Sequence, residues 1–204
     1  MGFFVLRTTV MFPIFLKLEG RRCLVVGAGV VGEGKVRGLL EARASVHVVA
    51  PQATAQIRTW AAQGALRWSV RVFEPRDLDG AFLVIVATPF GQVNQTVFHE
   101  ARARGVLCNA VDDPAHCDFY YPAVVRRGDL QIAISTGGRS PALAQRLRRE
   151  LEEQFGPEYE EWLKHLGEQR DELNALGLDM ESRRRLLHEI ASRRAFEDRT
   201  GRSN

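Results

Sequence analysis

The stretch that decides the fold is residues 24–32, which read Leu-Val-Val-Gly-Ala-Gly-Val-Val-Gly. The apolar residues at its start are typical of a buried strand. Gly27, Gly29 and Gly32 then follow with the G-x-G-x-x-G spacing, which permits a tight turn, close approach of the backbone to a pyrophosphate, and close packing of the next helix on the sheet. The pattern predicts a strand, a turn and a helix that bind a dinucleotide. The alternative is a glycine turn that holds no ligand.

Strand and helix signals alternate from this stretch to Pro114. Strands are expected over residues 46–50, 66–73, 82–87 and 106–111, and helices from the glycine turn to about residue 42 and over residues 54–63 and 93–104. Such alternation indicates an α/β fold with a Rossmann-type, doubly wound parallel sheet and right-handed crossovers. We therefore expect a dinucleotide-binding Rossmann domain over residues 1–113. Within it, residues 1–10 resemble an extension ahead of an alternative start at Met11.

The pattern changes after Pro114. Strands are expected over residues 119–125 and 130–135, followed by a helix that begins at Ser140-Pro141, an N-cap and a first-turn proline. Two strands and one helix are too small to bury their own apolar side within one chain, so we expect a homodimer. The predicted segments are a small dimerisation and substrate-binding sheet over residues 114–145 and a helical C-terminal region over residues 146–204.

The composition is that of an ordinary globular protein. Its 204 residues are 45% hydrophobic and 26% charged, with a net charge of +3. That charge is too small to indicate nucleic-acid binding, and no apolar run is long enough to cross a membrane. Three cysteines without a CxxC pair exclude a disulfide framework and a tetrathiolate zinc site, and they fit a reducing compartment. We expect a cytoplasmic protein without nucleic-acid or membrane partners.

Candidate cofactor contacts follow the first, second and fourth strands. The acidic residue that usually binds the ribose 2′-OH is missing, because the second strand ends Ala50-Pro51-Gln52. No arginine stands there either, so this rule does not separate NAD from NADP, and Gln52 and Thr54 are the candidates for the ribose. For Asn94, an ordinary helix cap is the alternative. The predicted cofactor-binding residues are Gly27, Gly29, Val30, Val31, Gly32, Pro51, Thr88 and Asn94.

Asp112 follows the fifth strand, at the edge where open α/β sheets place their ligands. A carboxylate there can act as a general base, and we predict Asp112 as the catalytic residue. The alternative is that it only shapes the turn before Pro114. The nearby run His116-Cys117-Asp118 matches no closed metal site, so no metal ligands are predicted.

A second candidate binding segment is Ser135-Thr136-Gly137-Gly138-Arg139-Ser140-Pro141. A glycine pair ahead of a capped helix forms an anion nest and the arginine adds donors, so the segment is expected to hold a carboxylate or phosphate. The alternative is a plain loop-to-helix junction. The first interpretation is favoured by the arginines that flank the segment, which are Arg126, Arg127, Arg146, Arg148 and Arg149. The predicted substrate-binding residues are Asn109, Thr136, Gly137, Gly138, Arg139 and Ser140.

Several motifs occur together in this sequence. They are Pro13-Ile14-Phe15-Leu16, the glycine turn with Lys35, Ala87-Thr88 with Asn94, Cys108-Asn109-x-Val111-Asp112, Phe119 with Pro122, and Ser135-Thr136-Gly137-Gly138-x-Ser140-Pro141. As a set they resemble the precorrin-2 dehydrogenase family, which also forms the N-terminal part of bacterial siroheme synthases. The match runs in order from about residue 12 to residue 155. The family has a serine where Thr136 stands, and the methyltransferase half of the fused enzymes does not follow in this sequence.

The resemblance implies NAD-dependent oxidation of the tetrapyrrole precorrin-2 to sirohydrochlorin, with Asp112 as the essential carboxylate and an intertwined homodimer. Some members also insert iron as ferrochelatases, for which Fe²⁺ or Co²⁺ is a substrate. A short-chain dehydrogenase is excluded, because no tyrosine is followed four positions later by a lysine. A non-catalytic NAD-binding redox sensor, with the C-terminal helices as its effector region, stays open as the alternative function.

Overall fold

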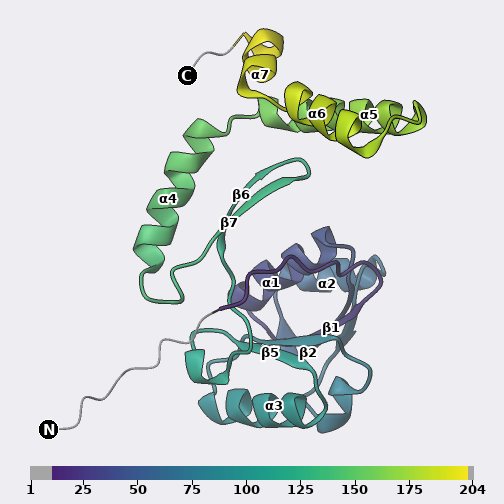
Figure 1. Cartoon of the computed structure of the whole chain (residues 1–204). Coiled ribbons are helices and arrows are strands. Elements are labelled where there is room, and N and C mark those ends of the chain that lie inside the picture. The colour runs from purple at the N-terminus through teal and green to yellow at the C-terminus, as the bar shows by residue number, and fades with distance from the viewer. Residues whose placement is uncertain (1–10, 202–204) are drawn as a thin grey trace, which may run out of the picture. The chain divides into compact units, whose positions relative to one another are not determined.

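The structure is a computed structural model that describes residues 11–201. It divides into two compact units, with the boundary between Tyr120 and Tyr121. The N-terminal unit contains a five-stranded parallel sheet in the order β3-β2-β1-β4-β5 (Figure 1). Because the strand order reverses at β1, the sheet has its topological switch point there, which is where such sheets bind ligands.

The strands of this sheet are β1 (Arg22–Ala28), β2 (Ser45–Ala53), β3 (Arg67–Ser69), β4 (Leu83–Val86) and β5 (Leu107–Ala110). The helices of the unit are α1 (Val30–Glu41), α2 (Ala55–Ala62) and α3 (Gly91–Ala103), with the short 3-10 helices η1 (Pro75–Leu78) and η2 (Pro114–His116). The predicted α/β fold with a doubly wound parallel sheet is confirmed.

Both faces of the sheet are buried, which explains its nearly continuous apolar strands. Alternate β1 side chains point to opposite faces: Val25 packs with Val36 of α1, and Val26 packs with Val97 of α3. Figure 1 shows α1 and α2 on one face of the sheet and α3 on the other. The two layers hold the C-terminal ends of β1, β2 and β4 at one edge.

Two strands of the parallel sheet end several residues away from where the sequence predicts. The strand predicted over residues 66–73 is reduced to β3, because this edge strand pairs only with residues 47–49 of β2 and the chain leaves the sheet after Ser69. The strand predicted to end before Pro51 continues to Ala53. The β1–β2 register shifts there, and such a shift accommodates a proline that donates no ladder hydrogen bond.

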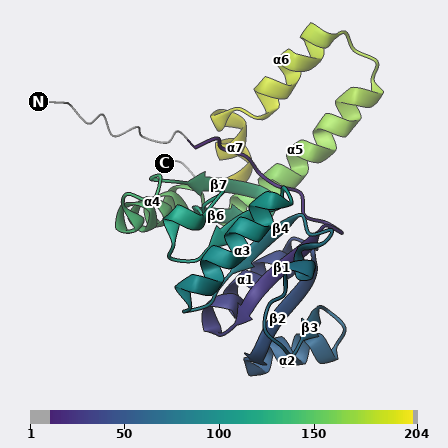
Figure 2. The same cartoon turned by 90° about the horizontal axis from the view of Figure 1, so that it is seen from below.

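The C-terminal unit contains the antiparallel hairpin of β6 (Ala123–Arg127) and β7 (Leu130–Ile134), followed by α4 (Pro141–Gln154), α5 (Glu158–Ala175), α6 (Met180–Ile190) and α7 (Arg193–Thr200). Strand β6 begins later than predicted, after Pro122, whose ring removes the N–H that pairing needs. The predicted caps of α4, Ser140 and Pro141, are present. Figure 2 shows α5 and α6 as a helical hairpin. The two predicted C-terminal features, a small sheet and a helical region, are confirmed.

Candidate functional site

The turn between β1 and α1 has no room for a side chain at two of its glycines. Gly27 has a φ of 99°, and a Cβ there would collide with the carbonyl oxygen of Ala87, just after β4. A Cβ at Gly32 would collide with the carbonyl oxygen of Gly27. A Cβ at Gly29, in contrast, would meet nothing within 4 Å. Gly27 and Gly32 therefore serve the fold, whereas the space beside Gly29 is open to a ligand.

A pocket of about 740 Å³ opens beside this turn. Its walls come from the glycine turn, the end of β2, the chain after β3, and the connection from β4 into α3. Five residues that the sequence singled out line it: the predicted cofactor-binding residues Gly27, Gly29, Pro51 and Thr88, and the ribose candidate Gln52. The sequence did not single out Val72, Phe73, Gln92, Val93 and Thr96, which also line it. The last three lie on one face of α3, so helical periodicity was the signal that could have found them.

Other predicted cofactor residues lie beside the pocket, not in its lining. They are Val30, Val31 and Gly32 at the start of α1, and Asn94 on α3. No side chain in the described chain caps α1, whose first-turn N–H groups have no acceptor within the helix. Asn94 is buried, and its Oδ1 accepts a hydrogen bond of 2.9 Å from the Thr88 hydroxyl. Asn94 therefore holds a residue of the pocket wall.

The pocket lining described here includes no charged side chain. Of the two candidates for the ribose, Gln52 lines the pocket, but Thr54 serves as the N-cap of α2, accepting a hydrogen bond of 3.3 Å from the Ile57 N–H. A dinucleotide fits this site, because its pyrophosphate binds helix N-termini. The start of α1 is uncapped, the space at Gly29 is open, and the lining of the pocket carries no charge. The residues present therefore fit a nicotinamide dinucleotide.

Asp112 lies in a four-residue turn after β5, outside the pocket lining. The turn spans residues 110–113 and is closed by a hydrogen bond of 3.1 Å from the Asp113 N–H to the Ala110 carbonyl. Asp112 has a φ of 61°. A positive φ at the third residue characterises a type II turn, where glycine or asparagine is usual. An aspartate in this conformation is strained, and such strain clusters at functional sites.

Lys35 of α1 lies close enough to Asp112 for their charges to interact. Burial lowers the pKa of Lys35, and the negative charge of Asp112 acts in the opposite direction. Lys35 is part of the family motif, but the sequence did not show that it faces the strand end after β5. The structure thus brings a cation and a carboxylate together at this edge of the sheet.

The chain after Asp112 folds back onto β5. The Oδ2 atom of Asp113 lies 2.7 Å from Nδ1 of His116, so the two side chains are hydrogen-bonded, and they form an ion pair when the ring is protonated. The predicted substrate contact Asn109 is buried, and its side-chain N–H donates to the Phe119 carbonyl oxygen at 2.7 Å. Asn109 therefore also ties the returning chain to the sheet. Among residues 11–201, no group of three or more His, Cys, Asp and Glu side chains is placed to hold a metal ion.

The other predicted substrate contacts lie in the C-terminal unit, between β7 and α4. The Thr136 hydroxyl accepts a hydrogen bond of 3.1 Å from the Ser140 N–H, and Ser140 caps α4 by accepting one of 3.2 Å from the Leu143 N–H. Gly137 and Gly138 both have a positive φ, 60° and 78°. The segment, which also carries Arg139, is therefore a structured turn at a helix start.

The flanking arginines, which favoured an anion nest, are largely engaged within the C-terminal unit. Arg127 donates to the carbonyl oxygens of Phe155 and Glu152, at 2.8 and 2.9 Å, and so closes the end of α4. Arg146 and Arg148 pair with glutamates one turn later on α4. Their charges therefore support the helix, and the sequence did not reveal these pairings.

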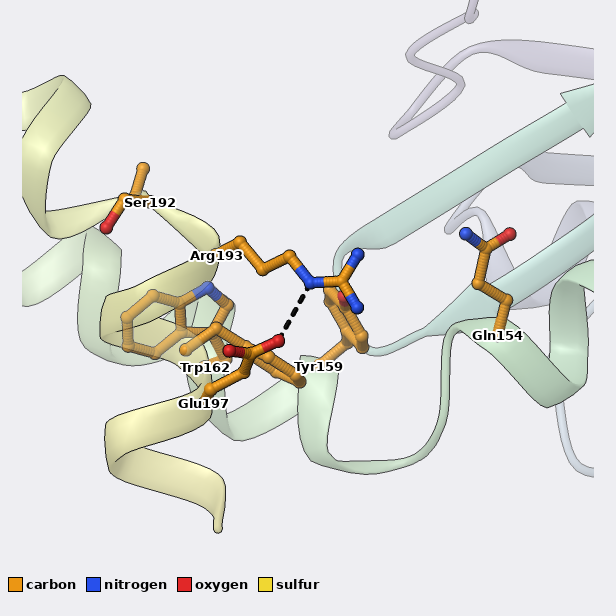
Figure 3. Close-up of a pocket in the computed structure, with 8 residues that line it drawn as sticks. Gln154, Tyr159, Trp162, Ser192, Arg193 and Glu197 are labelled. Carbon is orange, nitrogen blue, oxygen red and sulfur yellow. Dashed lines mark hydrogen bonds and ion pairs between the residues drawn. The ribbon is translucent and has the colours of Figure 1, made fainter. Parts of the chain in front are cut away.

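A smaller pocket of about 230 Å³ lies within the C-terminal unit (Figure 3). Tyr159 stacks on Phe196 with ring centroids 4.5 Å apart, and Trp162 meets Phe196 edge-on. Arg193 pairs with Glu197 at 2.8 Å beside them. Trp162 and Phe196 are buried, so these aromatic rings form the small core that joins α5 to α7.

Known proteins match this arrangement along most of the chain. Residues 14–123 match a family model for NAD(P)-binding domains, and residues 127–154 match the model of the central domain of sirohaem biosynthesis proteins. The solved structure of SirC, a precorrin-2 dehydrogenase, superposes with a TM-score of 0.78 at 30% identity, covering 93% of this chain and 98% of SirC. The chain belongs to the precorrin-2 dehydrogenase family.

Within the precorrin-2 dehydrogenase family, the chain is also similar to parts of longer proteins. Siroheme synthase 1 of Aeromonas hydrophila is 44% identical over 140 residues, which are 69% of this chain and 30% of that protein. The siroheme synthase of Chromobacterium violaceum is 39% identical over 179 residues, 88% of this chain and 38% of that protein. The chain thus spans about a third of the length of these relatives. The family resemblance expected from the motifs is confirmed, and the cofactor is a nicotinamide dinucleotide.

Proposed function

We propose that this protein oxidises precorrin-2 to sirohydrochlorin in siroheme biosynthesis, with NAD as the acceptor. The observation that carries this proposal is the neutral pocket at the Gly27–Gly32 turn, in a chain that is similar to SirC over nearly its whole length. NAD and not NADP is proposed on the family resemblance alone, because the lining contains neither the acidic residue nor the arginine that distinguishes the two cofactors. Gln52 is the proposed ribose contact.

The residues of the N-terminal unit have distinct proposed roles. The first-turn N–H groups of Val30, Val31 and Gly32 bind the pyrophosphate beside Gly29, Pro51 lines the pocket at the end of β2, and Thr88 contacts the second half of the dinucleotide. A bound nicotinamide supplies the acceptor for the hydride that leaves the macrocycle. Asp112 accepts, at a carboxylate oxygen, the proton that leaves with it, and then releases this proton to water.

The tetrapyrrole carries eight carboxylates, so it needs donors outside the nucleotide pocket. We propose that Asn109 and the segment from Thr136 to Ser140 bind the substrate, the latter through its glycine N–H groups and Arg139. We further propose that the protein acts as a homodimer in the cytoplasm. Among residues 11–201, no helix has both the length and the apolar character to span a membrane.

The decisive experiment supplies purified protein with precorrin-2 and either NAD or NADP, and follows sirohydrochlorin and NADH by absorbance. We expect turnover with NAD, slower turnover with NADP, and a loss of about a hundredfold to ten-thousandfold in Asp112→Asn, as for removal of a general base. The control Asp113→Asn keeps most activity. NAD binding without any turnover would identify the alternative, a redox sensor.

Chelatase activity is tested in the same assay. Metal insertion also needs an acceptor for the protons of two pyrrolic N–H groups, so the same carboxylate could serve it. Sirohydrochlorin is therefore incubated with Fe²⁺ or Co²⁺, with and without the protein. Faster metal insertion with the protein than without it would add ferrochelatase activity to the proposal. Light scattering at micromolar concentration measures the mass, and a monomer would contradict the proposed homodimer.

A further inference from the structure

The conformation of Asp112 requires support from outside its own turn. A left-handed φ costs an ordinary L residue roughly 1–2 kcal/mol, although aspartate tolerates it better than most. The hydrogen bond that closes the turn, from the Asp113 N–H to the Ala110 carbonyl, is common to type I and type II turns. It therefore does not by itself prevent rotation of the Val111–Asp112 peptide into the unstrained type I form.

The thiol of Cys117 bridges the two ends of this turn. Its Sγ lies 3.1 Å from the carbonyl oxygen of Ala110 and 3.2 Å from that of Asp113, the first and fourth residues of the turn. The side-chain N–H of Asn109 donates to the same sulfur at 3.4 Å. Burial raises the pKa of the Cys117 thiol, so the sulfur keeps the proton that it donates. The thiol thus links the turn to β5.

The surrounding chain holds Cys117 in this place. Cys117 pairs with Asn109 in an isolated antiparallel bridge. His116, its neighbour, bonds to the Asp113 carboxylate at 2.7 Å, and its ring lies edge-on to buried Phe98 of α3 at 5.2 Å. Residues of β5, α3 and η2 therefore hold the turn in place, and all of these contacts lie within the N-terminal unit.

We propose that Cys117 is a positioning residue whose thiol fixes both ends of the 110–113 turn against the returning chain, and so fixes the place from which the Asp112 carboxylate reaches the substrate. This inference rests on the proposed role of Asp112 as the base. Cys117 itself transfers no proton and forms no covalent bond. Loss of the thiol frees both ends of the turn, so the turn shifts together with the carboxylate, and misplacement by about 1 Å can cost a hundredfold in rate.

The test compares Cys117→Ala and Cys117→Ser, each alone and in an Asp112→Asn background. Alanine removes the donor, and serine restores one. We expect kcat to fall about tenfold to a hundredfold in Cys117→Ala and to stay within about threefold of wild type in Cys117→Ser. NAD affinity measured by calorimetry should not change in either variant. In the Asp112→Asn background, Cys117→Ala should cause no further fall in single-turnover rate.

Two controls separate positioning from general destabilisation. Cys23→Ala also removes a buried thiol, from β1, and should lower the melting temperature without changing kcat. Cys117→Val fills the space without a donor and replaces the alanine variant if that variant does not fold. The inference is overturned if both apolar variants keep kcat within about twofold of wild type, or if they reduce the rate equally with and without Asp112. Full activity of Asp112→Asn itself would instead show that Asp112 is not the proton acceptor, and this outcome would contradict the proposed function and not the Cys117 inference alone.

Discussion

Arg71 donates from both terminal guanidinium nitrogens to the two carboxylate oxygens of Asp77, at 2.8 and 2.5 Å. The side chain of Asp77 is 3% exposed, and it also accepts a hydrogen bond of 2.8 Å from the Glu74 N–H. The residues that follow Arg71 directly, Val72 and Phe73, line the nucleotide pocket. The ion pair therefore anchors the loop that forms one wall of that pocket.

Asp77→Asn should destabilise the protein and weaken NAD binding, because it removes the bidentate carboxylate that holds Arg71 and so loosens the loop, although Arg71 keeps a longer contact of 3.8 Å with Glu74. Because the Asp77 carboxylate is buried, the loss should exceed the roughly 1 kcal/mol that an exposed pair contributes. Urea denaturation and NAD calorimetry measure the two effects. Arg76→Gln, which breaks an exposed pair with Glu74, is the control and should cost less than about 1 kcal/mol.

Gly29 and Gly27 should respond oppositely to a side chain. Gly29→Asp should fold normally, because a Cβ there meets open space, yet abolish NAD binding by adding bulk and negative charge beside the pyrophosphate. Gly27→Ala should instead unfold readily, because its Cβ would collide with Ala87 and its φ is 99°. Melting temperatures and calorimetry distinguish the two outcomes. Undiminished NAD affinity in a folded Gly29→Asp protein would place the nucleotide elsewhere.

At position 112, glycine should stabilise the protein more than alanine does. Alanine is the more stable residue at most positions, but the φ of 61° reverses this order because only glycine adopts it without steric cost. We expect the free energy of unfolding to be about 1 kcal/mol higher for Asp112→Gly than for Asp112→Ala. Both variants should have lost activity. Equal stabilities would mean that position 112 is not strained.

His47 should make the protein less stable in mild acid. Burial lowers the pKa of this imidazole below its ordinary 6.5, and Arg67 lowers it further. Because the unfolded chain binds the proton more readily, His47 contributes full stability above about pH 6.5 and loses it as the pH falls, by at most about 1.4 kcal/mol per pH unit. His47→Gln should flatten the dependence of unfolding free energy on pH between pH 7 and 5. His188→Gln, which removes an exposed histidine, is the matched control.

The sequence by itself determined the features that depend on near neighbours along the chain. The turn at Gly27 and the cap at Ser140 could be predicted because each needs only local backbone geometry. The alternation of strands and helices likewise indicated the parallel sheet. Family motifs added Asp112, but no local pattern could show that it is left-handed, because its turn is held by Cys117 and by β5.

Only the tertiary structure decided how distant segments use their polar groups. The amide of Asn109 holds the returning chain at Phe119, and the guanidinium of Arg127 closes the end of α4, and neither partner can be read from the sequence. Nor could the sequence show that Val72 lines the nucleotide pocket, since that residue follows an edge strand shorter than its apolar pattern suggests. Hydrogen bonds and pocket walls join residues far apart in sequence, and their partners are set by packing of the whole unit, which periodicity does not encode.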